Sequence, residues 1–204
     1  SVGVNQDMME ISAGVLSSKV GEIMSLIASM AKEPRFIEAD FDRIKSQHQN
    51  LLSSYQGIAS YVAQNKFLQA AYGDKHPYAN PSSGTLKSLS SISLADIKKA
   101  HQDNFGANSA ALIVVGDVKF GEVESLAKKY FGSFKKNSAK NISIPEPTTN
   151  PKMRTILVER SDAPQTYIMV GRPLANRYDP DLASFQVLQN ILSGSPASRL
   201  DANL

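Results

Sequence analysis

Apolar side chains recur every three or four residues along most of the first 130 positions, the periodicity of helices that bury one face. This spacing predicts helices over residues 20–30, 41–55, 58–72, 94–101, 120–130 and 182–192. Capping residues predict where they begin: Ser17 or Ser18, Asp40, the pair Ser93 and Asp96, and Asp179 followed by Pro180. Breakers predict where they end: Pro34, Gly57, Gly132 and Gly194.

Shorter apolar runs between these helices predict strands. They cover residues 8–16, 110–115, 156–158 and 164–171. The run 110–115 is apolar throughout and stops at Gly116-Asp117, so it predicts a buried strand. Together with the helices, these strands predict an α/β protein.

A change in composition divides the chain. Residues 135–152 are rich in Lys, Asn, Ser and Thr and include Pro145, Pro147 and Pro151, which is typical of a linker. We therefore expect a first unit over 1–136, a linker over 137–152, and a second unit over 153–204 that begins strand–strand–helix. The second unit is too short to form a core of its own, so we expect it to be unstable alone.

Composition excludes several classes of protein. The chain has 204 residues and no Cys, which rules out disulfide scaffolds, iron–sulfur clusters and thiol catalysis. The net charge of +3 is too small to indicate a nucleic-acid-binding protein, and the lysines around 119–152 fit a solvated face. No apolar run approaches the roughly 18 residues of a membrane helix. We expect neither nucleic acid nor membrane as a partner.

Candidate chemistry is sparse. His48 and His101 lie on apolar helical stripes, which favours partly buried, hydrogen-bonded imidazoles over metal ligands. His76 lies in the loop 73–84, where loop packing is favoured over a substrate-binding or general-base role. Ser195 lacks the G-x-S-x-G context of a nucleophile, and residues 84–88 lack the spacing of a phosphate loop.

A set of short segments, in order along nearly the whole chain, resembles the insulinase/pitrilysin family of zinc peptidases, which includes the mitochondrial processing peptidases and their bacterial homologues. The segments are PRF at 34–36, YGDKHPYA at 72–79, GTLKSL at 84–89, ISLADI at 92–97, VVGDV at 114–118, APQT at 163–166 and LSGSPASRL at 192–200. The resemblance implies paired α/β units, each an antiparallel sheet with helices packed on one face.

The resemblance also implies a zinc site that this sequence does not contain. The family's inverted motif H-x-x-E-H is absent from all 204 residues. A further zinc-ligating Glu is expected on the helix after Asp42-Arg43, where Gln47, His48 and Gln49 stand instead. We assign no catalytic, cofactor-binding or metal-binding residue to this chain. Zinc is expected only in an active homologue or partner.

Three functional readings follow. The favoured one is a catalytically silent segment of a processing-peptidase-like protein that helps to enclose a peptide or unfolded protein, beside an active zinc-peptidase subunit or a second copy. The second is a fragment of an active zinc metalloendopeptidase whose motif lies upstream. The third is an unrelated α/β binding module. A bacterial periplasm or cell envelope is the favoured compartment.

The dispersed histidines lead to a direct prediction. Tight zinc sites need three or four converging N, O or S ligands, so the isolated chain should retain far less than one zinc ion after dialysis. Metal analysis of the dialysed protein checks this. A stoichiometric zinc ion per chain would show that the ligand helix is wrongly assigned.

Overall fold

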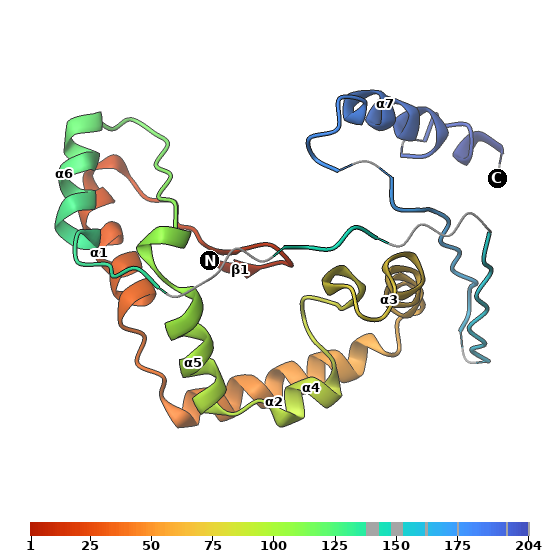
Figure 1. The fold of residues 1–204 in the computed structure, drawn as a ribbon, viewed down its shortest axis with the longest axis horizontal. Coiled ribbons are helices and arrows are strands. Elements are labelled where there is room, and N and C mark those ends of the chain that lie inside the picture. The colour runs from red at the N-terminus through yellow and green to blue at the C-terminus, as the bar shows by residue number, and fades with distance from the viewer. Residues whose placement is uncertain (138–142, 148–152, 162, 175, 195, 204) are drawn as a thin grey trace.

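The computed structural model describes residues 1–137, 143–147, 153–161, 163–174, 176–194 and 196–203. Its helices follow a curved path around a small antiparallel hairpin near the N-terminus (Figure 1). The strands are β1 (Val2–Val4) and β2 (Met9–Ile11), and the α-helices are α1 (Val20–Lys32), α2 (Glu38–Tyr55), α3 (Ala59–Tyr72), α4 (Leu86–Ser91), α5 (Leu94–Asn104), α6 (Phe120–Phe131) and α7 (Leu182–Leu192). Short 3-10 turns are η1 (Ser17–Lys19), η2 (Pro77–Ala79), η3 (Ala107–Ser109) and η4 (Asp201–Asn203).

Helices α1 and α6 pack side by side although about a hundred residues separate them (Figure 1). Gly21 of α1 faces Leu126 of α6, because a Cβ at position 21 would lie in ordinary van der Waals contact, 3.6 Å, with the Cδ2 atom of Leu126. Met24, Ala28 and Ala31 are the buried side chains of α1 and repeat at helical spacing. Their burial explains why the apolar stripe of this segment correctly predicted a helix.

Helix α1 ends before Pro34, and the chain turns into α2 through Phe36, which has a left-handed φ of 47°. This conformation costs a non-glycine residue about 1 kcal/mol and needs support from its surroundings. The support is the His101 ring, whose centroid lies 5.4 Å from that of Phe36 in an edge-on arrangement. The turn between the first two helices therefore depends on a side chain of α5.

Helix α2 also packs against α4. Lys45 of α2 donates hydrogen bonds of 3.0 and 2.6 Å to the backbone oxygens of Ser90 and Ile92, at the C-terminal end of α4. A cation at this position satisfies carbonyls that the helix leaves unpaired. Helix α5 begins with a capping box between Ser93 and Asp96, as predicted. The Ser93 hydroxyl and backbone N–H both donate to the Asp96 carboxylate and lower the pKa of that group.

The C-terminal part leaves this helical body. Residues 153–159 and 165–171 run beside each other in Figure 1, and the chain then continues into α7. Arg160 donates to the backbone oxygen of Gln56 at 2.6 Å, and a Cβ on Gly171 would lie 2.9 Å from the Phe67 ring. These contacts place the C-terminal part against the end of α2 and against α3.

The predicted fold class is correct only in part, because the described residues are mostly helical and their sheet has two strands. The predicted strand over 8–16 is reduced to β2, and the pattern missed β1. Residues 110–115, 156–158 and 164–171 form no strand. Ile113, Val115, Leu157 and Val170 are 82%, 92%, 90% and 93% exposed. Apolar β-branched sequence favours extended backbone, but a strand also needs a neighbour to complete its hydrogen bonds.

The predicted helices all form, with differences at their ends. Asp40 does not cap α2, which begins after Ile37, and Asp40 instead pairs with Arg43 in the first turn. Helix α7 begins three residues beyond Asp179, whose carboxylate accepts from the Asp181 backbone N–H in a preceding turn. The segment 84–88 forms a second capping box and begins the short helix α4, which is not among the predicted helices. Among the described residues, no helix combines the length and apolar character needed to cross a bilayer.

The entrance to the predicted linker is held in place. Asn137 donates its backbone N–H to Asn108 Oδ1 at 2.8 Å, and the Lys135 carbonyl accepts from Ala107 at 3.0 Å. A Cβ on the buried Gly106 would lie 2.5 Å from the Asn137 nitrogen. Glycine is therefore required at 106 for residues 135–137 to pack here. The segments 138–142 and 148–152 lie outside the described residues, and the linker boundaries remain a prediction.

This contact predicts opposite effects for two Gly→Ala substitutions. Gly106→Ala should lower the free energy of unfolding by about 1–3 kcal/mol, because the added methyl group overlaps the backbone of Asn137. Gly121→Ala, in α6 with open space around it, should raise it by up to about 1 kcal/mol through helix propensity. Denaturant unfolding measures both changes. Equal stability of the two variants would contradict the close approach.

Candidate functional site

The loop between α3 and α4 gathers aromatic and titratable side chains from segments far apart in the sequence. Helix α3 supplies Tyr72 and ends at Gly73, whose φ of 82° favours glycine. Pro77 then begins the turn η2, and the ring of His76 accepts from the Tyr78 backbone N–H at 3.1 Å. These local features turn His76 inward and bring Tyr78 toward the N-terminal hairpin.

The imidazole of His76 has both ring nitrogens engaged. Its Nδ1 accepts from Tyr78, so its Nε2 carries the proton and donates to the Pro145 carbonyl at 2.8 Å. The residue is 5% exposed, and its ring lies 4.9 Å from that of Tyr72. The interpretation of His76 as a packing residue of the loop is confirmed. In this arrangement neither nitrogen is available to a metal ion or a substrate proton.

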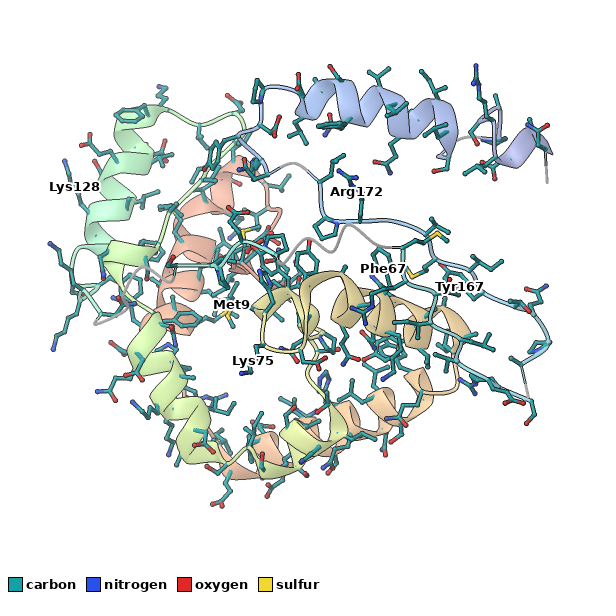
Figure 2. The ribbon with its side chains drawn as sticks, turned by 45° about the vertical axis from the view of Figure 1, so that its right-hand side comes forward. Met9, Phe67, Lys75, Lys128, Tyr167 and Arg172 are labelled. Carbon is teal, nitrogen blue, oxygen red and sulfur yellow. The ribbon has the colours of Figure 1, made fainter. Side chains whose placement is uncertain are left out.

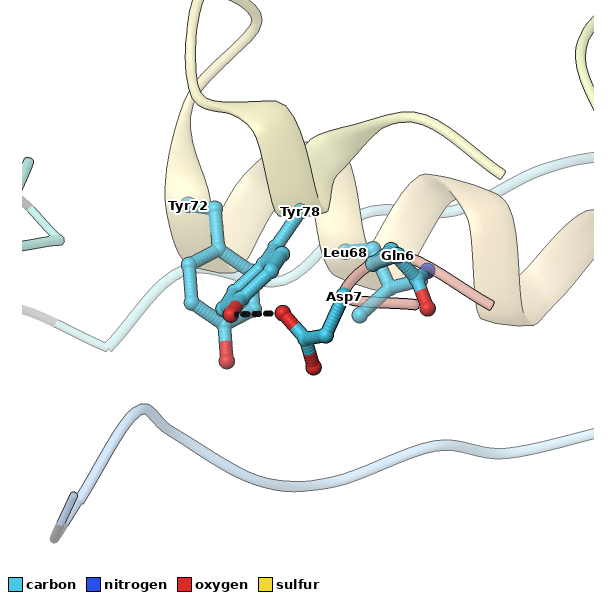
Figure 3. Close-up of a pocket in the computed structure, with 5 residues that line it drawn as sticks. All are labelled: Gln6, Asp7, Leu68, Tyr72 and Tyr78. Atoms are coloured by element: carbon cyan, nitrogen blue, oxygen red, sulfur yellow. Dashed lines mark hydrogen bonds between the residues drawn. The ribbon is translucent and has the colours of Figure 1, made fainter. Parts of the chain in front are cut away.

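Tyr78 joins the loop to the hairpin. Its hydroxyl donates to Asp7 Oδ1 at 2.6 Å, a bond that spans 71 positions of sequence (Figure 3). This hydrogen bond to a carboxylate raises the pKa of Tyr78, because ionising the phenol would remove the proton that the carboxylate accepts. The phenol is thus held in its neutral form.

A shallow pocket of about 250 Å³ lies at this junction, lined by Gln6, Asp7, Leu68, Tyr72 and Tyr78 (Figure 3). The rings of Tyr72 and Tyr78 meet nearly at right angles, with centroids 5.8 Å apart. A carboxylate beside two phenol rings can hold a cationic or hydrogen-bond-donating group. The lining offers a single carboxylate and no imidazole nitrogen, so it supplies no acid–base pair for hydrolysis.

The other two histidines lie on separate elements. His48 Nε2 is 2.9 Å from the Ser83 carbonyl, and His101 Nε2 is 2.9 Å from the Ala31 carbonyl. Both rings are partly buried, and His101 also stacks on Phe105 at 4.6 Å. The expectation of hydrogen-bonded core imidazoles is confirmed. In the part of the chain that the structure describes, no three His, Asp or Glu side chains are grouped to hold a metal ion.

The remaining candidates have structural roles where they are described. Thr85 and Ser88 form the cap of α4, which accounts for the segment that resembled the end of a phosphate loop. The lysines at 119, 128, 129, 135 and 136 are exposed, and Lys128 pairs with Glu124 at 2.7 Å. Ser195, Lys140 and Lys152 lie outside the described residues. Sequence reasoning missed Asp7, because no local signal relates it to Tyr78.

A comparison with known families identifies the class of protein. The model described as "Peptidase M16 inactive domain" matches residues 91–204, more than half of the chain. The chain therefore belongs to the peptidase M16 family, as the resemblance to the insulinase/pitrilysin peptidases predicted. The reading as an unrelated α/β module is wrong.

Individual relatives agree with this assignment. A "non-peptidase homolog", YmxG of Helicobacter pylori, is 23% identical over 98% of this chain and 46% of its own length. A "zinc protease", PqqE of the same organism, is 29% identical over 68% of this chain and 32% of its own length. A solved peptidase M16 inactive domain from Pseudomonas fluorescens has the same fold, with a TM-score of 0.75, 23% identity and coverage of 99% of this chain and 49% of that one. The chain spans about half or less of the length of these relatives.

The bond between Tyr78 and Asp7 predicts a local, pH-dependent effect. Tyr78→Phe should speed amide hydrogen exchange in the β1–β2 hairpin and leave the α1–α6 pair unchanged, since it removes the contact that fastens the hairpin to the loop. Because the pKa of Tyr78 is raised on folding, this contact stabilises the fold below the ordinary tyrosine pKa of about 10 and is lost as pH rises through the raised value.

Hydrogen exchange by mass spectrometry, followed from neutral to alkaline pH, measures both parts. Tyr130→Phe is the matched control, because Tyr130 lies on α6 away from the hairpin. Unchanged hairpin exchange in Tyr78→Phe would contradict the fastening role.

Proposed function

We propose that this chain is the catalytically silent part of an M16-type protein that helps to enclose a peptide or unfolded protein during processing. Its working partner is an active zinc-peptidase subunit or a second copy of the same protein. The support is the family assignment and the relative named a non-peptidase homolog, which aligns with nearly the whole chain.

One observation carries the proposal. On α2, where the family resemblance implies a zinc-ligating Glu, the chain has Gln47, His48 and Gln49. Amide side chains are neutral and poor zinc ligands, and among the described residues His48 is not grouped with two further His, Asp or Glu side chains that could hold a metal ion. Without a metal ion, no residue of this helix can activate water for peptide hydrolysis.

The proposed organisation has two α/β units, over 1–136 and 153–204, joined by the linker 137–152. The segments 110–115, 156–158 and 164–171 would be sheet strands within these units, which would account for their apolar sequences and their exposed side chains. Their further neighbours would come from the rest of a protein that, like the relatives, is about twice as long. The apolar face of α7, with Val187, Leu188 and Ile191, would cover the second sheet.

The second candidate, a fragment of an active zinc metalloendopeptidase, is favoured by one observation. The relative named a zinc protease is 29% identical over its aligned part, against 23% for the non-peptidase homolog. That alignment covers 68% of the chain, whereas the other covers 98%. The broader match favours the silent member.

A peptidase assay tests the proposal. The chain alone should not cleave a mixture of internally quenched peptides, with or without added zinc, but should increase cleavage by an active M16 zinc peptidase of the same organism. Cleavage by the partner supplies the positive control and should stop with a chelator. Chelator-sensitive cleavage by the chain alone would show that it is an active peptidase and would refute the catalytically silent role. The absence of any effect on candidate partners, together with no peptide binding, would refute the enclosing role.

A further inference from the structure

A second, larger pocket of about 320 Å³ lies between α2, α3 and the start of α4, on the opposite part of α3 from Tyr72. Its floor is apolar, with Leu52 of α2, which is 2% exposed, and Leu86 of α4 among the lining residues. Its volume lies within the range of small-molecule and peptide side-chain sites. None of its lining residues belongs to the pocket beside Tyr78 or to the exposed lysines at 119–136.

The polar lining of this pocket consists mainly of side-chain amides. Asn65 and Gln69 follow one another by a single helical turn on α3, and Gln56 stands at the end of α2. Within the described residues, the side-chain amides of Asn65 and Gln56 make no hydrogen bond, although Asn65 is half-buried. No buried side-chain polar atom of the described residues lacks a partner, so both amides are open to solvent and to a ligand. A primary amide both donates and accepts, which matches the backbone of an extended peptide.

The charge of the lining is one-sided. Lys66 is the charged residue among those that line the pocket, and its Nζ makes a long contact of 3.4 Å with Gln69 Oε1. No carboxylate lines the pocket, whereas the pocket beside Tyr78 contains Asp7. The aliphatic floor, the amide rim and the single ammonium group together suit a peptide in which an apolar side chain is followed by an acidic one.

We propose that this α2–α3–α4 pocket binds an extended peptide through an aliphatic side chain on Leu52 and Leu86, its backbone amide on Asn65, and an adjacent carboxylate beside Lys66. The inference rests on the proposed peptide-enclosing function and adds the class of sequence that this part of the chain selects. A cationic peptide is disfavoured, because Lys66 would repel it and no acid is present to pair with it.

Fluorescence anisotropy with three labelled hexapeptides tests the site. They share one sequence except for a central pair that is Leu-Glu, Leu-Gln or Leu-Lys. The unmodified 204-residue chain should bind Leu-Glu most tightly and Leu-Lys most weakly. Lys66→Gln should weaken binding of the Leu-Glu peptide by about two- to fivefold, as expected for the loss of a solvent-exposed ion pair. It should leave the affinity for the Leu-Gln peptide unchanged. Asn65→Ala should weaken binding of the Leu-Glu and Leu-Gln peptides by about tenfold, because each would lose one hydrogen bond.

Two matched controls lie on α5, where Lys98 and Gln102 are exposed and are not among the residues that line the pocket. Lys98→Gln and Gln102→Ala should leave all three affinities unchanged. Lys66→Glu should reverse the order of preference in favour of Leu-Lys, a gain that an unfolded protein cannot produce. Asn65→Ala should keep its thermal transition, because Ala is the stronger helix former.

The outcomes separate this inference from the proposed function. The pocket assignment would be overturned if the unmodified chain failed to bind the Leu-Glu peptide. It would also be overturned if Asn65→Ala and Lys66→Gln bound that peptide as tightly as the unmodified chain. If the chain binds the peptides through another surface, the pocket fails and the enclosing role stands. If the chain proves to be a chelator-sensitive peptidase whose KM changes in these variants, the silent role fails and the pocket stands.

Discussion

Hydrogen bonds from imidazole rings to distant backbone carbonyls hold the helical path together. His48, His76 and His101 each bond through Nε2 to a carbonyl that lies 35, 69 and 70 positions away. The three contacts fasten α2 to the loop before α4, η2 to the described linker residues, and α5 to the end of α1. Few side chains are fully buried in the described residues, so polar links between segments carry much of the tertiary organisation. In His76 the second ring nitrogen is engaged as well, because Nδ1 accepts from the Tyr78 backbone N–H.

The extended apolar segments of the chain are left exposed in the structure. Val115 and Val170 are almost wholly exposed, and the apolar face of α7 has no cover among the described residues. Large exposed apolar surfaces in proteins mark places where another chain or another part of the same chain packs. Family relatives of about twice this length are consistent with the proposal that such cover comes from the remainder of the protein.

The two pockets beside α3 give this chain chemistry that does not depend on catalysis. One combines the Asp7 carboxylate with two phenol rings, and the other combines amides with Lys66. Each lining offers hydrogen-bonding groups and one side-chain charge, and among the described residues no three His, Asp or Glu side chains are grouped to hold a metal ion. These pockets underlie the proposed binding role. Figure 2 shows Phe67 of α3 near Tyr167 of the extended C-terminal segment, which agrees with the approach of Gly171 to the Phe67 ring.

The sequence by itself determined the helices, because their apolar stripes, Pro and Gly breakers and the Ser93–Asp96 box act within a few residues. Ordered motifs also identified the family, and the amides at 47 and 49 indicated a missing zinc ligand. Tertiary structure alone decided which histidine bonds to which carbonyl and that Asp7 meets Tyr78, since no local pattern encodes a partner 71 positions away. It also decided that residues 110–115 have no strand beside them among the described residues. Helices satisfy their hydrogen bonds within one segment, whereas a strand exists only when a second strand lies beside it.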